Sequence, residues 1–340
     1  MLSLGAFTLK KHRNAAMANM SIVRNDGSVV RNATEDEIAH AFLDERQLVW
    51  IDLDQPPTDD DVRIVMNLPG IGESAPEHIT QPHKGPRAAG FHTYLLVVIY
   101  DIGLIPDGPG IDKDELVLLI GDRYLVTVHS ASSTRLAQVA DHLDPALNRF
   151  GVTIGAIVFA IIDAVVDRYL EVLDVVRKRI ESLEKRVLDQ DEPEAITELY
   201  HLRRELTELR RVIAPEESLI GARSTPHPAF SDPDLQDAML DVKHNMQRAV
   251  DEIDQYLAML PDILTTFEAL KSDNLNRIVK LLTVWSIILT AVALLPTVLG
   301  ISLSREPSVS PYVGYVVSTG AMVLVGGVIW YVFRRHGWVD

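Results

Sequence analysis

The sequence predicts an α+β membrane protein with an N-terminal α/β domain, long coiled-coil-like stalk helices and a C-terminal hairpin of two transmembrane helices. Three observations predict this class. Apolar stretches rich in β-branched residues alternate with helical segments over residues 1–150. Apolar residues recur at helical spacing over residues 151–280, and two long uncharged runs follow.

Residues 1–150 are expected to form the α/β domain. Thr34 precedes a helical pattern and Glu37 follows three residues later, which is the pattern of a capping box and predicts a helix over residues 34–43. Gly121-Asp122-Arg123 separates two apolar stretches and predicts a hairpin turn. Four stretches are predicted strands: residues 48–51, 94–100, 116–120 and 124–128.

Residues 151–280 are expected to form the helical stalk. Its first helix is predicted from Thr153 to about Leu188 and its second over about Ala195–Ile213. Pro215 is expected to interrupt the helical pattern after the second helix. A third begins near Asp234 and continues into the membrane, with a kink or break expected at Pro261. The first helix carries an apolar seam of residues three and four apart: Ile157, Ile161, Val165, Tyr169, Leu173, Val176, Ile180, Leu183 and Val187.

The two uncharged runs predict transmembrane helices over residues 281–304 and 312–333, joined by a periplasmic loop over 305–311. Each is long enough, because roughly 20 apolar residues span a hydrocarbon core. The tail, residues 334–340, is basic.

The charges that flank the runs predict their orientation. Arg277 and Lys280 precede the first run and Arg334 and Arg335 follow the second, whereas the loop contains a single basic residue, Arg305. The positive-inside rule therefore predicts a multi-pass protein of the inner (plasma) membrane with both termini in the cytoplasm.

Composition narrows the function. The net charge is −16, from 48 acidic and 32 basic residues, which argues against nucleic acid as a partner and suits a surface that meets cations, although many acidic proteins are simply soluble. No cysteine is present, so thiolate metal ligands and thiol catalysis are excluded. The sequence also contains no Walker-type phosphate loop, no G-x-S-x-G and no H-E-x-x-H. We therefore expect no enzyme activity and no cofactor.

A row of small and hydroxyl side chains follows one face of the first predicted transmembrane helix. The spacing of three and four residues indicates a polar lining for a water-filled pore, and two spans cannot enclose a pore alone, so a homo-oligomer is expected. In the alternative interpretation, the hydroxyls bond carbonyls one turn back or bridge to a neighbouring helix, with no pore. The row consists of Thr283, Ser286, Thr290, Ala293 and Thr297.

Several motifs together resemble the CorA family of divalent-cation transporters, which includes the ZntB-like branch. Trp50-Ile51-Asp52-Leu53 and Tyr124-Leu125-Val126-Thr127-Val128-His129 look like family strands. The strongest resemblance lies at the C-terminal end. Its matching positions are Asn276, Lys280, Leu282 and Thr283 before and at the first span, Gly300-Ile301-Ser302 at the G-M-N signature, Pro307 in the loop, Gly314-Tyr315 at the second span, and Arg334-Arg335 with Trp338 in the tail.

The resemblance implies a funnel-shaped homopentamer in the lipid bilayer with a cation pore lined by the first span. Leu282 would fall at an apolar constriction and Asn276 at the cytoplasmic mouth. The chain departs from the family at the signature, where Ser302 replaces asparagine, and in the loop, where Ser308 replaces glutamate and Glu306 lies two residues earlier. The implied pore-lining residues are Asn276, Leu282, Thr283, Ser286, Thr290, Ala293, Thr297, Gly300 and Ser302.

We therefore expect transport of metal cations such as Mg²⁺, Zn²⁺, Co²⁺ or Ni²⁺, with relaxed or altered selectivity because G-I-S replaces G-M-N. The alternative is a transport-defective protein of the same fold that senses or regulates through its cytoplasmic domain. Polar residues along the first span favour transport, and loss of the signature favours the alternative.

Two further groups of residues contain side chains that can bind metal ions. Asp251, Asp254 and Asp262 on the stalk are candidate sites for regulatory divalent cations, and the alternative is a solvated acidic helix face. The histidines match no compact zinc motif, so hydrogen-bonded strand or loop histidines are the preferred interpretation: His78, His83, His92 and His129.

Overall fold

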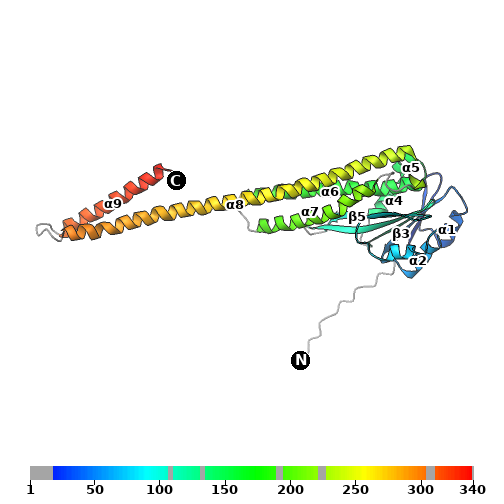
Figure 1. Ribbon diagram of the computed structural model, residues 1–340, viewed down its shortest axis with the longest axis horizontal. Coiled ribbons are helices and arrows are strands. Elements are labelled where there is room, and N and C mark those ends of the chain that lie inside the picture. Colours follow the sequence, from blue (N-terminus) through cyan, green and yellow to red (C-terminus); the bar gives the residue numbers. More distant parts are fainter. Residues whose placement is uncertain are drawn as a thin grey trace, which may run out of the picture. The chain divides into compact units, whose positions relative to one another are not determined.

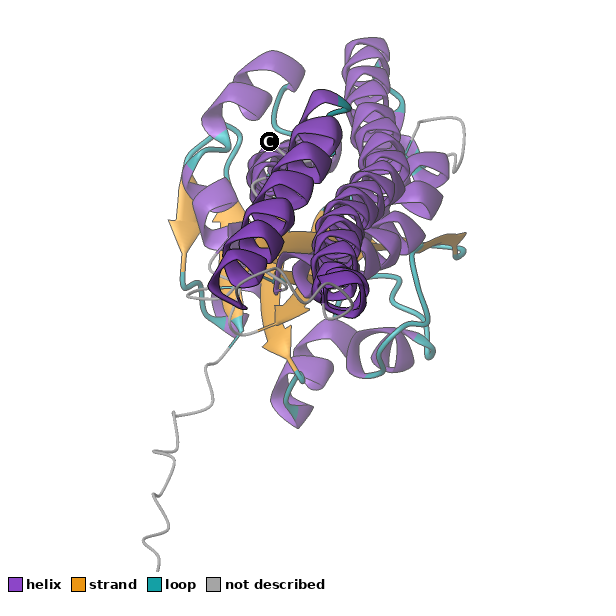
Figure 2. Cartoon of the chain, turned by 90° about the vertical axis from the view of Figure 1, so that its left-hand side faces the viewer, coloured by secondary structure: helices purple, strands orange, loops and turns teal. Residues whose placement is uncertain are grey.

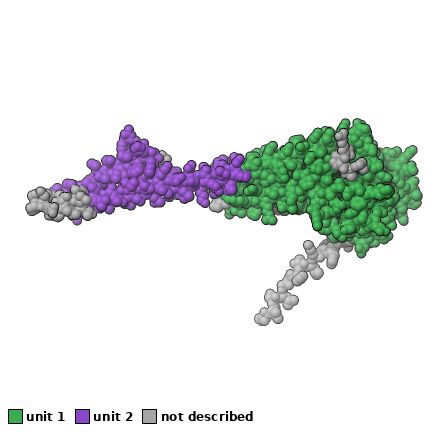
Figure 3. Space-filling model, viewed as in Figure 1, with its two compact units in different colours: residues 1–183, 194–260 green, residues 184–193, 261–340 purple. Residues whose placement is uncertain are grey.

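The structure is a computed structural model that describes residues 18–105, 110–130, 135–188, 194–220, 227–303 and 311–338. The chain divides into two compact units (Figure 3). The first unit contains Met1–Leu183 and Glu194–Leu260, and the second contains Glu184–Pro193 and Pro261–Asp340. Each unit is described in turn.

A seven-stranded sheet in the order β2-β1-β3-β7-β6-β5-β4 is the centre of the first unit. β3 and β7 pair in parallel, and the other neighbouring pairs are antiparallel. The four predicted strands are confirmed as β3, β5, β6 and β7, whereas β1, β2 and β4 were not predicted. The strands are β1 Asn19–Val23, β2 Val29–Arg31, β3 Leu48–Gln55, β4 Arg87–Gly90, β5 Leu95–Leu104, β6 Ile111–Ile120 and β7 Tyr124–Ser130.

Three short helices cover one face of this sheet, as Figure 1 shows. They are α1 Glu35–Ala41, α2 Asp59–Met66 and α3 Ala75–Thr80. The predicted capping box of α1 is confirmed, because the Glu37 backbone N–H donates to Thr34 Oγ1 at 3.3 Å and the Thr34 N–H donates to the Glu37 carboxylate at 2.8 Å. Side chains such as Ile51, Leu119 and Val126, each fully buried, form the core beneath these helices.

The other face of the sheet packs against α4 Arg135–Asp141 and α6 Ile154–Leu188, with α5 Asp144–Phe150 between them along the chain. In Figure 2 helices lie on both sides of the strands. The predicted seam of α6 is confirmed in full. All nine of its apolar residues are at most 2% exposed. Burial of an apolar side chain of this size contributes roughly 1.5–3 kcal/mol, so the seam is a large part of what holds α6 in place.

Two prolines do not end their helices. α7 runs from Glu194 to Leu219 with Pro215 inside it, so the predicted interruption there is wrong. A proline removes one helix hydrogen bond, and here buried bonds made by Glu216 hold the last turn. After the short helix Pro228–Phe230 (η1), α8 runs from Pro233 to Leu303 with no break at Pro261.

Ion pairs connect the long helices of the first unit. Arg179 on α6 bonds Glu198 at 3.0 Å and Glu205 at 3.1 Å on α7, with its side chain only 16% exposed. Arg210 on α7 pairs with Asp254 on α8, and Lys243 on α8 lies 3.5 Å from Glu217. Charged pairs therefore fix the register of three helices that are otherwise joined by apolar contacts.

Gly155 on α6 has no room for a side chain. A Cβ there would overlap the carbonyl oxygen of Ala229 and lie 2.6 Å from Leu235 Cδ2. We expect Gly155→Ala to lower the free energy of unfolding by about 2 kcal/mol, because backbone must shift to accept the methyl group. Urea unfolding of the detergent-solubilised chain measures this loss. Gly72→Ala is the control, since its Cβ would meet only ordinary contacts at 3.8 Å, and an equal loss there would contradict the steric explanation.

The second unit contains the membrane-facing part of α8 and the helix α9, Pro311–Arg335. Among the described residues, these two helices are long and apolar enough to cross a membrane. Their large apolar side chains are exposed rather than packed, for example Leu289 at 64% and Val323 at 71%. Such a surface is unstable in water and suits contact with lipid.

Candidate functional site

The first span has two distinct faces in this chain. Val284 is fully buried, and the Cγ2 atoms of Ile288 and Val292 lie 3.9 and 3.7 Å from where a Cβ of Gly326 would be, so this face of α8 contacts α9. Residues turn by about 100° per position around a helix axis. The row of hydroxyl residues therefore lies roughly 180° from the face that contacts α9.

Nothing in the described chain covers the row of hydroxyl residues. Ser286, Thr290 and Ala293 are exposed, and Thr283 is half-buried. Leu282 is 60% exposed and Asn276 is also exposed. The predicted pore-lining residues whose side chains are described thus share a free surface of α8.

The threonine hydroxyls of this row bond to their own helix. Thr283 Oγ1 donates to the Val279 carbonyl at 2.8 Å, and Thr290 Oγ1 donates to the Ser286 carbonyl at 2.7 Å. The back-bonding considered as an alternative therefore occurs at both positions. It uses the hydroxyl proton and leaves the oxygen lone pairs as acceptors, which is the capacity that a cation or its bound water requires.

Some predicted residues cannot be placed in this way. Thr297, Gly300 and Ser302 belong to the last turns of α8, but nothing is described of their side chains. Glu306 and Ser308 lie outside the described residues. The outer end of the predicted pore, including the G-I-S segment, stays a prediction.

The glycines of α9 behave differently from one another. The sequence of α9 contains four glycines, Gly314, Gly320, Gly326 and Gly327, and small residues in a membrane helix predict a close approach to the neighbouring helix, here α8. Gly326 allows such an approach, but a Cβ at Gly320 or Gly327 would meet nothing within 4 Å, so for these two the expectation is wrong in this chain.

The three candidate acids of the stalk do not converge within one chain. Asp254 pairs with Arg210, Asp251 is exposed one turn before it, and Asp262 is exposed in the second unit. In the described parts of the chain, no three histidine or acidic side chains are placed to hold a metal ion. A cation site at these residues would need acids from more than one chain, and it stays a prediction.

Two of the histidines have carboxylate partners. His83 Nδ1 lies 2.8 Å from Glu115, and His129 Nε2 lies 3.2 Å from Asp52. Burial lowers the pKa of His129, but the hydrogen bond and charge of Asp52 outweigh it and raise that pKa above its usual value. Burial lowers the pKa of His78, whose ring packs against Phe91 at 5.0 Å. For His83 and His129, the preferred interpretation is confirmed.

A buried acid that sequence analysis missed joins three elements. Glu216 on α7 is fully buried, its Oε1 accepts the Tyr100 N–H of β5 at 2.8 Å, and its Oε2 lies 2.7 Å from the Tyr169 hydroxyl of α6. The Tyr169 hydroxyl also donates to the Tyr100 carbonyl. One hydroxyl proton cannot serve both acceptors fully, so a protonated Glu216 completes the set by donating to Tyr169.

Burial raises the pKa of Glu216 to about 8, and the nearby charge of Asp101 adds to this although the bonds to Tyr169 and Tyr100 oppose it. The sequence does carry a signal for this acid. Glu216 continues the spacing of the buried residues Leu209 and Ile213, so an acid occupies a position where the pattern calls for an apolar residue.

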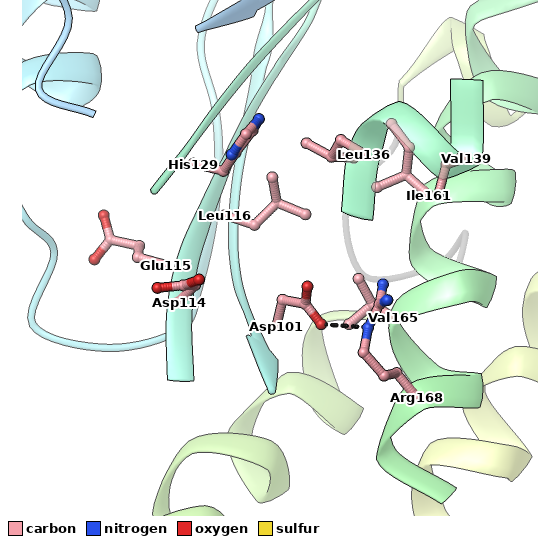
Figure 4. A pocket seen from close by; sticks show the side chains of 10 residues that line it. All are labelled: Asp101, Asp114, Glu115, Leu116, His129, Leu136, Val139, Ile161, Val165 and Arg168. Carbon is pink, nitrogen blue, oxygen red and sulfur yellow. Dashed lines mark hydrogen bonds and ion pairs between the residues drawn. The ribbon is translucent and has the colours of Figure 1, made fainter. Parts of the chain in front are cut away.

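A small cavity lies between α6 and the face of the sheet that packs against it (Figure 4). Asp101 points into it and pairs with Arg168 at 2.7 Å, while His129 lies at its other end. The cavity volume is about 10 Å³. A single water molecule needs a cavity of roughly 10–15 Å³, so this cavity is too small for a substrate. The ion pair of Asp101 with Arg168 joins β5 to α6 here.

The sequence matches a known family along most of its length. The model of the family described as CorA-like Mg²⁺ transporter protein matches residues 45–335. The cobalt/magnesium transport protein CorA of Thermotoga maritima is 21% identical over 314 residues, covering 90% of this chain and 88% of that protein. The zinc transport protein ZntB of Klebsiella pneumoniae is 24% identical over 181 residues, covering 53% of this chain and 55% of that protein.

The solved structures show the same fold. The complete CorA magnesium transporter from Methanocaldococcus jannaschii matches with a TM-score of 0.73 and 17% identity, covering 96% of this chain and 100% of that one. The predicted α/β domain, long helices and two apolar C-terminal helices are thereby confirmed. The family is one of membrane transporters, so the prediction that the chain is not an enzyme is also confirmed. With the match extending over residues 45–335, the chain belongs to the family of CorA-like Mg²⁺ transporter proteins.

Proposed function

We propose that this chain conducts divalent metal cations across the inner membrane through a pore at the centre of a homopentamer, lined by the row of hydroxyl residues on α8. The observation that carries the proposal is the separation of faces on α8. One face contacts α9, and the opposite face carries Ser286 and Thr290 exposed. In an isolated chain this polar face would meet lipid, whereas in a ring of copies it meets the axis.

The chemistry of the row suits a hydrated cation. Hydroxyl oxygens are neutral acceptors, so they can bond the water shell of an ion without binding it too tightly to leave. Mg²⁺ gives up its waters reluctantly, so a wide hydroxyl-lined path matches it better than a tight cage of ligands. Leu282, five times around the axis, forms an apolar constriction that stops flow when it is dry.

The selectivity of the proposed pore among cations depends on the outer end of α8, where the chain departs from the family signature. A serine side chain is shorter than asparagine, so a ring of Ser302 is wider and offers weaker acceptors than the family's signature. The relatives named above are transport proteins for cobalt and magnesium, and for zinc. We therefore propose relaxed selectivity among Mg²⁺, Co²⁺, Ni²⁺ and Zn²⁺, with both termini in the cytoplasm.

The test is ion flux into liposomes that contain the purified full chain, with dyes for Mg²⁺, Zn²⁺ and Co²⁺ inside. We expect uptake of more than one of these ions, increased by an inside-negative membrane potential because the ions carry charge through an uncoupled pore. Liposomes without protein are the control. An oligomer that is intact on gel filtration but passes no divalent cation would contradict transport and favour the sensing alternative.

A further inference from the structure

Four basic residues of the second unit have no acidic partner. Arg277 and Lys280 on α8 and Arg334 and Arg335 on α9 are all exposed, and none forms an ion pair among the described residues. Their surroundings explain this. After Asp273, the described residues of both helices contain no aspartate or glutamate at all. In a chain of net charge −16, these four cations, within α8 and at the C-terminal end of α9, form a distinct basic surface.

Lys280 on α8 and Arg334 on α9 lie at about the same level along the two helices. The rings of Trp285 on α8 and Trp330 on α9 are 6.0 Å apart, which fixes how the two helices pass each other. Lys280 precedes Trp285 by five residues and Arg334 follows Trp330 by four. At 1.5 Å per residue, both lie about 6–8 Å beyond the tryptophan pair in the same direction.

The basic surface lies to one side of the row of hydroxyl residues. Arg277 lies seven residues before Val284 and therefore on the same side of α8, the side that contacts α9. Lys280 lies between the two faces of α8, about 40° from Val284 and about 60° from Thr283 around the helix axis. A cation on the pore face would repel the transported ion, and Arg277 avoids that face.

We propose that Arg277, Lys280, Arg334 and Arg335 form a binding surface for the headgroups of anionic phospholipids, with Trp285 and Trp330 at the level of the lipid glycerol. Guanidinium and ammonium groups bind phosphate oxygens, and arginine does so with two parallel hydrogen bonds. Indole rings prefer the boundary between headgroups and acyl chains. Anionic lipid bound here holds this part of α8 and the C-terminal end of α9 at the membrane surface.

Tryptophan fluorescence reports such lipid directly. The full chain is reconstituted in phosphatidylcholine with increasing brominated phosphatidylglycerol, and quenching gives the affinity for phosphatidylglycerol relative to phosphatidylcholine. Trp50 is buried at 2% exposure in the sheet and supplies an unquenched background. We expect a clear preference for phosphatidylglycerol that weakens as salt is raised, since screening shortens the reach of charge to about 8 Å at physiological ionic strength.

Charge variants provide the decisive comparison. Each basic residue near an anionic surface strengthens binding about fivefold, so Arg334→Gln with Arg335→Gln should reduce the preference about 25-fold, and Arg277→Gln with Lys280→Gln similarly. Arg334→Lys with Arg335→Lys should retain most of it. The matched control is Lys271→Gln, an exposed cation on α8 about 14 Å further from the tryptophan level than Lys280, which should change nothing.

Three results would overturn the proposal. One is equal quenching by both lipids in the unmodified chain, which requires no variant to be stable. Another is an unchanged preference in both double glutamine variants when they elute as the unmodified oligomer does. Displacement of the lipid by millimolar inorganic phosphate would likewise assign the surface to free anions instead of phospholipid.

Discussion

Replacing Ser286 and Thr290 together by leucine is expected to reduce divalent-cation flux at least about tenfold, because the pore would lose two rings of neutral acceptors and gain apolar bulk. Both side chains are exposed on the side of α8 opposite to its contact with α9. The change therefore leaves the packing of the two helices intact. Dye-loaded liposomes measure the initial rate of uptake for Mg²⁺ and Co²⁺.

The control for this variant makes the same chemical change on the outer helix. Thr319 on α9 is exposed, and Thr319→Leu replaces a hydroxyl with an apolar group facing lipid. We expect its flux to match the unmodified chain. If Thr319→Leu lowers flux as strongly as the double change on α8, the row of hydroxyl residues has no special role and the pore lies elsewhere.

Stability should fall steeply with rising pH because of Glu216. Burial raises the pKa of Glu216 to about 8 in the folded chain, against a usual value of 4.5. The folded state therefore binds the proton more tightly than the unfolded state. This contribution is fully present below about pH 4.5 and is lost as the pH rises through about 8. The gap between these values corresponds to at most about 5 kcal/mol.

Glu216→Gln should remove most of this dependence. A glutamine carbonyl still accepts the Tyr100 N–H, and its amide donates to the Tyr169 oxygen as the protonated acid does. Urea titrations of the detergent-solubilised chain from pH 5 to pH 9, followed by circular dichroism, give the comparison. We expect the variant to be the more stable protein at pH 9.

Glu217→Gln is the matched control. The carboxylate of Glu217, next to Glu216 in the sequence, is partly exposed beside Lys243 and is not buried. This variant should keep the pH dependence of the unmodified chain. A glutamine at position 216 that leaves the slope between pH 5 and pH 9 unchanged would show that Glu216 is ionised in the fold and that another group titrates.

Periodicity predicted the parts of the fold that depend on local pattern. The α6 seam, the Thr34 capping box and the strands with continuous apolar runs follow from spacing alone. β2 and β4 escaped because they are short strands at the two edges of the sheet. β1 lies inside the sheet and escaped because polar residues such as Asn19 and Ser21 alternate with apolar ones along it. The continuation of α7 through Pro215 depends on bonds from Glu216 to β5 and α6, which no local pattern contains.

The candidate site was predictable to the same extent. Helical spacing placed the hydroxyl residues on one face, and the packing of α8 against α9 leaves that face open. Spacing did not predict which glycines of α9 meet α8, because Gly320, Gly326 and Gly327 all suit a close contact in sequence. Only the partner surface decides that question.

The back-bonds of Thr283 and Thr290 bear on how such a protein is made. A hydroxyl whose proton is already shared with Val279 or Ser286 on the same helix carries no unmet donor into hydrocarbon. A newly synthesised chain can therefore insert as a monomer before any pore exists to receive its polar face. In the proposed pentamer, assembly is a later, separate event within the bilayer, and it brings hydroxyl oxygens that faced lipid to a pore where water and ions can use them.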